Sequence, residues 1–243
     1  MRSVRTLVVS AAVMAAFVVL GEGSATAQTL DEVIAKNLAA RGGVEKLRSL
    51  QTVKATGVME ARGTEIPIAT WAKRPNKMRR DQKLPDRTIS VAFDGTTVWM
   101  LDSSVGVPQE MTGPQADATR DEAIFDPLFL TYKERGHKIE LVGNETLDGL
   151  AVHHVRVTKK NGSVEDHYLN AETGLEFRTV TVMEQAGVKA ELRTDFSDYR
   201  AMDGMQVPFS IRQFMNGNPV VQVRLKEFEF NVSIDDAIFS IPK

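Results

Sequence analysis

The sequence predicts a mainly β domain of the α+β class, made of antiparallel strands and two helical segments. Residues 52–102 read as five short strands joined by turns, and seven more strands follow residue 137. Apolar and polar residues alternate along the first strand, which is typical of a sheet with one covered face and one solvated face. Connections of two to four residues allow only antiparallel neighbours.

The first helical segment is Thr29–Leu50. Thr29 and Glu32 form a capping box, which marks a helix N-terminus. The apolar residues that follow at helical spacing are Leu30, Val33, Ile34 and Leu38. Gly42-Gly43 interrupts the pattern, so a short second helix is expected after it, and the segment would then plug the sheet.

A meander of five strands comes next. Its predicted strands are Thr52–Arg62, Glu65–Arg74, Lys77–Lys83, Thr88–Phe93 and Thr96–Leu101. A polar segment from Asp102 to Thr119 follows, with an exposed loop expected at Gly113-Pro114. One or two short helices are expected in Arg120–Tyr132, where Asp126-Pro127 would break or restart a helix.

The second half of the chain is predicted to be all β. Its strands are expected at His137–Val142, Ala151–Lys159, Ser163–Asn170, Leu175–Met183, Val188–Arg200, Gln206–Phe214 and Pro219–Phe230. Ile238 and Phe239 of the tail should tuck under the sheet. A sheet of about twelve strands must split into two packed sheets or curve around other elements. The helical segments are the elements it would enclose, and they are small. An apolar cavity is therefore expected to remain.

The first 27 residues have the pattern of a secretory signal peptide. Arg2 and Arg5 form a basic head, Leu7–Leu20 is an apolar run, and cleavage is expected between Ala27 and Gln28. The apolar run is too short to span a bilayer, which needs about 20 residues. Residues 28–243 are therefore expected to form a single domain in the periplasm, soluble after cleavage and with no membrane span.

Charge and cysteine content exclude several classes of function. Loss of Arg2, Arg5 and Glu22 with the signal changes the net charge from −2 to −3, which argues against nucleic acid or an anionic membrane as partner. The chain has no cysteine, so it has no disulfide, no thiolate metal site and no acceptor for a lipid anchor.

No enzyme signature or cofactor motif occurs in the sequence. Asn161-Gly162 predicts a two-residue type I′ hairpin turn, which would place Arg156 opposite His167 and both on the polar outer face with His154 and Glu165. These residues lack further ligands for a metal ion, so no metal site is expected. Asp235-Asp236 is interpreted as structural. A hydrolase with catalytic residues dispersed along the chain stays open.

Two groups of residues are candidates for binding. Aromatic, methionine and aliphatic residues could form ordinary core or line a pocket for acyl chains. They are Val53, Ala55, Met59, Trp71, Met78, Val91, Phe93, Trp99, Phe125, Phe129, Phe196, Phe209 and Phe214. A basic run could form a rim that meets an anionic head group or a partner protein, or could protect a strand edge from aggregation. Its members are Arg74, Lys77, Arg79 and Arg80.

Several motifs, taken in order, resemble the outer-membrane lipoprotein-sorting proteins, the LolA/LolB-like periplasmic carrier superfamily. They include Gly42-Gly43 after the first helix, the run Trp71–Arg79, Phe93–Trp99, His167–Gly174, Phe196–Arg200 and Asp235–Phe239. The resemblance covers nearly the whole mature chain. It implies an unclosed, strongly curved antiparallel barrel of about 11–12 strands, with a helical lid over a hydrophobic cavity.

The resemblance also implies a function. The expected function is that of a non-enzymatic periplasmic carrier that binds lipoprotein acyl chains or other lipids for sorting to the outer membrane, with inner- or outer-membrane transport proteins as further partners. The alternatives are an envelope-stress sensor or adaptor that binds a partner protein through the same concavity, and the hydrolase above.

Overall fold

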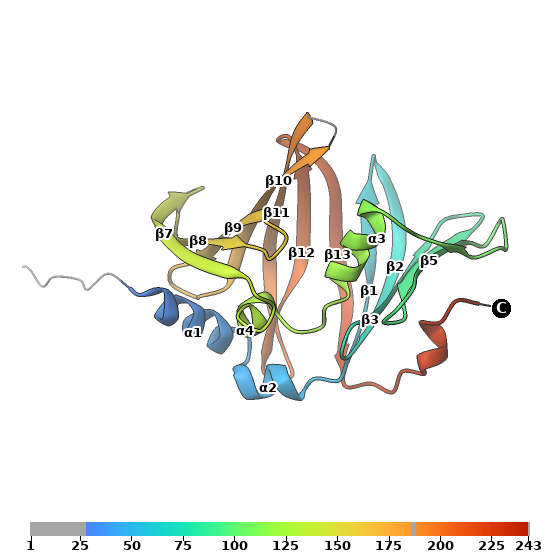
Figure 1. Ribbon diagram of the computed structural model, residues 1–243, viewed down its shortest axis with the longest axis horizontal. Coiled ribbons are helices and arrows are strands. Elements are labelled where there is room, and N and C mark those ends of the chain that lie inside the picture. Colours follow the sequence, from blue (N-terminus) through green and yellow to red (C-terminus); the bar gives the residue numbers. More distant parts are fainter. Residues whose placement is uncertain (1–27, 186–187, 243) are drawn as a thin grey trace, which may run out of the picture.

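The computed structural model describes residues 28–185 and 188–242, so the predicted signal peptide and Ala27 lie outside the described residues. All of its strands belong to one antiparallel sheet of 13 strands, in the order β6-β5-β4-β3-β2-β1-β13-β12-β11-β10-β9-β8-β7. The edge strands β6 and β7 do not pair with each other, so the sheet is not closed. Figure 1 shows it curving around the helices. The predicted fold class is confirmed.

The strands follow the predicted order with one addition. Their bounds are β1 Thr52–Ala61, β2 Thr64–Lys73, β3 Lys77–Lys83, β4 Thr88–Phe93, β5 Val98–Asp102, β6 Gln109–Glu110, β7 Lys138–Leu147, β8 Leu150–Thr158, β9 Val164–Asn170, β10 Glu176–Gln185, β11 Val188–Met202, β12 Met205–Met215 and β13 Asn218–Phe230. The addition is β6, a two-residue strand in the segment predicted to be a loop. It is too short to carry an alternating pattern that a sequence could reveal.

Four α-helices accompany the sheet among the described residues. They are α1 Leu30–Ala40, α2 Val44–Ser49, α3 Pro114–Glu122 and α4 Leu128–Thr131. The Thr29–Glu32 capping box is present at α1. The loop predicted at Gly113-Pro114 is wrong, because Pro114 begins α3. Proline suits a first helical turn, where the missing N–H has no helical partner to lose.

The predicted register of the β8–β9 hairpin is wrong by one residue. The Lys159 N–H donates to the Ser163 carbonyl, so the loop has three residues and ends at Gly162, whose φ is +87°. Three-residue hairpin loops place a left-handed residue at this position. Arg156 therefore pairs with Asp166 and Val155 pairs with His167. A one-residue slip moves side chains to the other face, so His167 leaves the outer face.

The helices cover one face of the sheet, called here the inner face. On β1, β2 and β3 this face carries Val53, Ala72 and Met78, which lie opposite one another, while Lys54, Trp71 and Arg79 lie on the outer face. Helices α1, α2 and α4 pack on β8, β9 and the start of β12, with buried residues such as Leu38, Leu47, Phe129, Val155 and Leu169. Helix α3 packs separately on β3 to β5.

The C-terminal tail covers the outer face of β2 to β5. Its short 3₁₀ helix, η1 (Asp236–Ile238), precedes Phe239, which is fully buried and accepts a hydrogen bond of 2.7 Å from the Trp99 indole N–H. Phe239 is thus under the sheet as predicted, whereas Ile238 is only half-buried. The sheet in this region is covered on both faces.

Candidate hydrophobic pocket on the inner face

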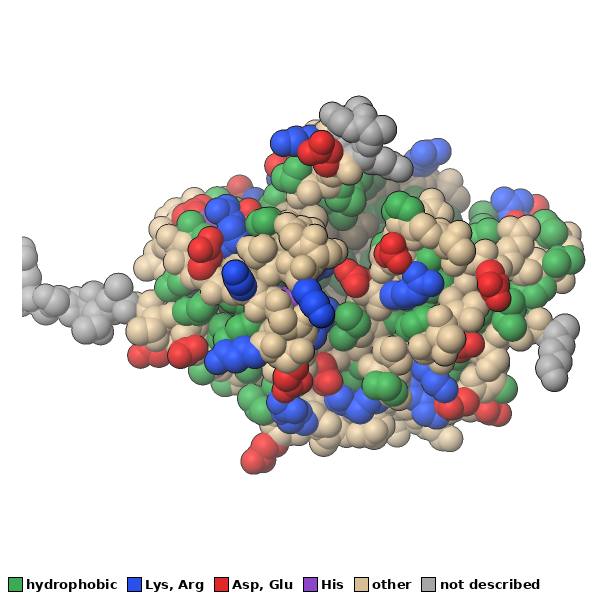
Figure 2. Space-filling model, in the orientation of Figure 1, with side chains coloured by type: hydrophobic (Ala, Val, Ile, Leu, Met, Phe, Trp, Pro, Cys, Tyr) green, Lys and Arg blue, Asp and Glu red, His purple; other side chains and the backbone are tan. Residues whose placement is uncertain are grey.

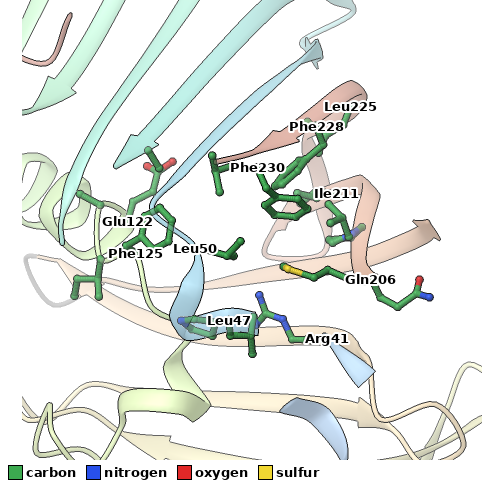
Figure 3. Close-up of a pocket in the computed structure, with 18 residues that line it drawn as sticks. Arg41, Leu47, Leu50, Glu122, Phe125, Gln206, Ile211, Leu225, Phe228 and Phe230 are labelled. Carbon is green, nitrogen blue, oxygen red and sulfur yellow. The ribbon is translucent and has the colours of Figure 1, made fainter. Parts of the chain in front are cut away.

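A pocket of about 290 Å³ opens on the inner face between the two groups of helices. Its lining residues are Arg41, Leu47, Leu50, Val53, Ala72, Glu122, Ala123, Ile124, Phe125, Pro127, Met205, Gln206, Val207, Pro208, Ile211, Leu225, Phe228 and Phe230. Figure 3 shows Phe228, Phe230 and Ile211 on one side and Leu47, Leu50 and Phe125 across from them. Arg41 and Glu122 are the only charged side chains of the lining. We call this the inner-face pocket.

The pocket exists because neither group of helices covers the middle of the sheet. Its floor is formed by β1, β12 and β13, whose inner-face side chains include Val53, Ile211, Leu225, Phe228 and Phe230. Figure 2 shows a hollow between the surface over β7 to β10 and the surface over α3 and β2 to β5. Central strands that carry apolar residues, with only the end of one helix and the loop after it above them, leave an apolar hollow.

The roof of the pocket is formed by Glu122, at the end of α3, and by residues 123–127 after it; α3 and these residues are called here the lid. Arg74 fixes the end of the lid: its guanidinium lies 2.6 and 2.8 Å from the two carboxylate oxygens of Asp126. The same group donates to the carbonyls of Leu50 and Leu47 at 2.8 and 3.3 Å, and it lies 4.9 Å from the centre of the Phe125 ring. One side chain, directly after the end of β2, therefore joins the end of α2 to the lid.

The predicted basic run does not form one surface. Arg74 and Arg80 lie on the inner side, where Arg80 contacts Glu122 of the lid at 2.8 Å. Lys77 and Arg79 lie on the outer side and bind the tail and strand neighbours instead: Lys77 lies 2.7 Å from Asp236, and Arg79 lies 2.8 Å from Asp81. Alternation along the strand divides the run between two faces. All four charges have acidic partners within the chain.

The predicted cavity residues fall into three groups. Val53 and Phe125 line the pocket. Others lie on the inner face around it or in its flanking cores: Ala55, Met59, Met78, Val91, Phe93, Phe129 and Phe196. Met78 and Phe93 lie buried beneath α3, and Phe129 lies buried between α4 and the sheet.

The remaining four predicted cavity residues belong to neither of these two groups. Trp71 and Trp99 are on the outer face, where Arg79 lies between their rings. Phe214 stacks under the guanidinium of Arg193 at 3.9 Å. Phe209 is buried and borders another surface depression, lined among others by Ser197 and Arg200. The register in which the strands pair decides which face of the sheet each side chain occupies, and composition does not reveal that register.

Sequence reasoning missed the aromatic floor of the pocket. Phe228 and Phe230 lie in the last strand and alternate with Glu227 and Glu229. That alternation is the signal that could have found them, because it predicts one apolar face. Leu225 precedes the pair across an irregularity in the β1–β13 register, which hides its face from a simple count.

A second hollow of about 330 Å³, called here the polar hollow, adjoins the pocket. Its lining residues are Arg41, Asp121, Ile124, Phe125, Asp126, Pro127, Leu128, Arg135, Lys159, Glu165 and His167, of which Arg41, Ile124, Phe125 and Pro127 also line the pocket. An apolar site and a charged site therefore lie side by side, an arrangement that suits the two ends of an amphiphile.

His167 is the most deeply buried charged group at the polar hollow. Its side chain contacts Glu176 at 2.6 Å through Nδ1 and the Phe129 ring at an edge. Burial would lower the pKa of His167, but the carboxylates of Glu165 and Glu176 raise it to about 9. Burial likewise would raise the pKa of Glu165, but the positive charges of His167, 3.5 Å away, and of Lys159, 2.6 Å away, lower it to about 2. Both groups are therefore charged at neutral pH.

Within the part of the chain that the structure describes, no group of three or more His, Asp or Glu residues has the geometry to hold a metal ion. His154 lies on the outer face, between Glu145 and Asp166, and stacks on Tyr168.

The helices in residues 28–185 and 188–242 include none with the length and apolar character needed to cross a bilayer.

Comparison with known proteins shows similarity in structure. No protein-family model matches the sequence, and no curated protein matches it. A DUF1329 family protein from Desulfovibrio piger superposes with a TM-score of 0.61 at 15% identity, covering 85% of this chain and 95% of that one. A LolA superfamily protein from Nitrosomonas europaea gives a TM-score of 0.60 at 14% identity, with 88% and 98% covered.

A third solved structure is similar to the same extent. It is described as an outer membrane lipoprotein-sorting protein domain from Vibrio parahaemolyticus, with a TM-score of 0.61, 10% identity, and 86% and 94% of the two chains covered. At these identities the likeness concerns the fold. The chain therefore has the LolA-like fold, and the resemblance predicted from the sequence is confirmed at that level.

Proposed function

We propose that this protein is a periplasmic carrier that binds a hydrocarbon chain of a lipid or lipoprotein in the inner-face pocket. The observation that carries the proposal is the uncovered middle of the sheet, where Leu225, Phe228 and Phe230 face a hollow instead of a helix. Exposed apolar surface of this kind is costly in water and favours an apolar ligand. The LolA-like fold agrees with such a role.

The size of the pocket limits the ligand. A volume of about 290 Å³ lies at the lower end of the range for ligand sites, roughly 300–1,000 Å³. Burial of hydrocarbon contributes about 0.8 kcal/mol per methylene, so a chain of about a dozen carbons gains up to roughly 10 kcal/mol before ordering costs. The pocket as it stands fits one chain, and a ligand with several chains would require the lid to move.

The chemistry of the lining favours binding over catalysis. Among the lining residues there is no serine, threonine, histidine or cysteine, and the charged members are Arg41 and Glu122. A hydrolase needs a nucleophile or an activated water beside a general base. The hydrolase alternative therefore gains no support from the pocket. We propose that the protein is not an enzyme.

The adaptor alternative also loses its motivation. It relied on the basic run as a contact for a partner protein, and Arg74, Lys77, Arg79 and Arg80 each pair with an acidic residue of this chain. A partner would have to replace those pairs. Transport proteins of the inner or outer membrane remain the partners that a carrier would require to load and release its ligand.

Mass spectrometry of the protein from its own host tests the carrier function. The protein is purified from the cell envelope without detergent, extracted with organic solvent, and the extract is compared with that of an Ala72→Phe variant whose pocket is partly filled. We expect a lipid or acyl compound with the wild-type protein and much less with the variant. Extracts without any acyl compound, from a protein that also ignores added fatty acid, would refute the proposal.

A further inference from the structure

Two arginines border the polar hollow without an acidic partner. Within residues 28–185 and 188–242, neither Arg41 nor Arg135 forms an ion pair, although both are half-buried. The acidic residues of the lining already have other partners: Asp126 binds Arg74, and Lys159 lies 2.6 Å from Glu165 and 3.6 Å from Asp121. The hollow therefore has unneutralised positive charge. Figure 2 shows basic side chains beside the opening.

The buried histidine of the hollow also has an unused polar atom. His167 is 6% exposed, and its Nε2 forms an ion pair with a Glu165 carboxylate oxygen at 3.5 Å but makes no hydrogen bond. Burying a polar atom without a hydrogen bond is costly, so such atoms in native proteins call for an explanation. A ligand oxygen in the hollow would supply the missing acceptor.

The inner-face pocket and the polar hollow share some of their lining residues. Arg41 borders both, and Figure 3 shows it at the Leu47 end of the inner-face pocket. The lid lies between the two, because its residues Ile124, Phe125 and Pro127 line both the inner-face pocket and the polar hollow. A molecule with a hydrocarbon chain on one side of this partition would place its other end beside Arg41 and Arg135.

Resting on the carrier function above, we propose that the polar hollow binds the anionic head group of the ligand whose hydrocarbon chain lies in the inner-face pocket. The head group is a phosphate or a carboxylate, which the planar fork of an arginine recognises through two hydrogen bonds. The ligand class is then a single-chain anionic amphiphile or one chain of an anionic lipid.

Competition between amphiphiles with the same chain tests the head-group site. Displacement of a fluorescent acyl probe is measured with dodecyl phosphate, dodecanoate, dodecanol and dodecyltrimethylammonium, the ionic compounds below their micelle concentrations and dodecanol below its solubility limit. We expect the two anions to bind about tenfold more tightly than dodecanol, the effect of a charge-assisted hydrogen bond. Arg135→Gln and Arg41→Gln should each reduce this preference to within about threefold. Arg212→Gln, on the exposed outer face, should leave it unchanged.

The outcomes separate the two proposals. Equal binding of dodecanol and the anions, or tighter binding of the ammonium compound, would overturn the head-group site and leave the carrier function standing. Displacement by inorganic phosphate alone at the same concentrations would also overturn it, because the hollow would then be a site for free anion. Failure of every amphiphile to displace the probe would overturn the carrier function, and the head-group site with it.

Discussion

Arg74 connects more parts of the site than any other side chain described above. It binds Asp126 with two hydrogen bonds and the carbonyls of Leu50 and Leu47 with two more. Both ionic side chains are 23% exposed, so the pair is only partly screened by water. Since a bidentate pair combines strength with fixed geometry, Arg74 is expected to hold the lid in place.

Replacement of Arg74 tests this role. Arg74→Met should leave Asp126 without its partner and lower the free energy of unfolding by about 2 kcal/mol. Hydrogen exchange should accelerate in residues 123–128 and stay unchanged in α1 and β8. Arg79→Met, which removes an arginine from the outer face of the adjacent strand, is the matched control. Unchanged exchange in residues 123–128 would contradict the proposed role.

His167 predicts a dependence of stability on alkaline pH. Its pKa is raised from 6.5 to about 9 in the folded protein. A group with a raised folded pKa contributes stability that is fully present below 6.5 and is lost as pH rises through about 9. We expect the free energy of unfolding to fall by on the order of 3 kcal/mol across that interval.

A variant isolates the histidine from other groups that titrate nearby. His167→Gln keeps a hydrogen-bond donor beside Glu165 and Glu176 but has no proton to lose. The difference in unfolding free energy between wild type and variant, measured by urea denaturation, should shrink from pH 6.5 to about 9. A difference that is constant with pH would show that His167 does not titrate in this interval.

At the scale of single residues, sequence reasoning succeeded where local pattern decides the outcome. The Thr29–Glu32 capping box depends on residues three apart and is present as predicted. Trp71 and Trp99 are large and apolar, but their positions depend on strand register and on the tail that covers them. Partners distant in sequence decide which face a side chain occupies, and composition does not contain that information.

At the scale of elements, the β8–β9 hairpin shows how one residue changes a functional interpretation. The turn was placed correctly at Asn161-Gly162, but the loop has three residues instead of two. As a result His167 faces the helices and the polar hollow instead of the solvent. The dipeptide is common to both loop types, so the sequence alone did not distinguish them.

Strand β2 offers a matched pair of substitutions for the pocket. Ala72 lines the pocket, and Ala69, three residues earlier on the same strand, lies on the outer face opposite Asp81. Ala72→Phe should fill part of the hollow and weaken binding of an acyl probe at least about tenfold, since roughly two methylenes lost from contact account for that factor.

Ala69→Phe is the control for effects on folding. It adds the same group to the same strand outside the pocket, and it should change probe affinity by less than about twofold. Circular dichroism and thermal unfolding establish that both variants fold. Equal loss of affinity in the two variants, or no loss in either, would place the ligand elsewhere.

At the scale of the whole molecule, the strand count predicted the cavity better than any motif did. A sheet of 13 strands extends beyond what helices α1 to α4 cover, and the remainder is the floor formed by β1, β12 and β13. The sequence predicted more strands than its short helical segments could cover, and therefore an uncovered part of the sheet. It did not predict where the gap would fall, because the division of helices into two groups depends on tertiary packing.

The most direct test of the pocket is the dependence of affinity on chain length. Unbranched fatty acids of about six to about eighteen carbons are titrated against the protein at one pH. Each added methylene that enters the pocket contributes about 0.8 kcal/mol, so affinity should rise about fourfold per carbon. It should then reach a plateau when the hollow of about 290 Å³ is full. An affinity that does not depend on chain length, or that rises without a plateau, would contradict a bounded hydrocarbon pocket.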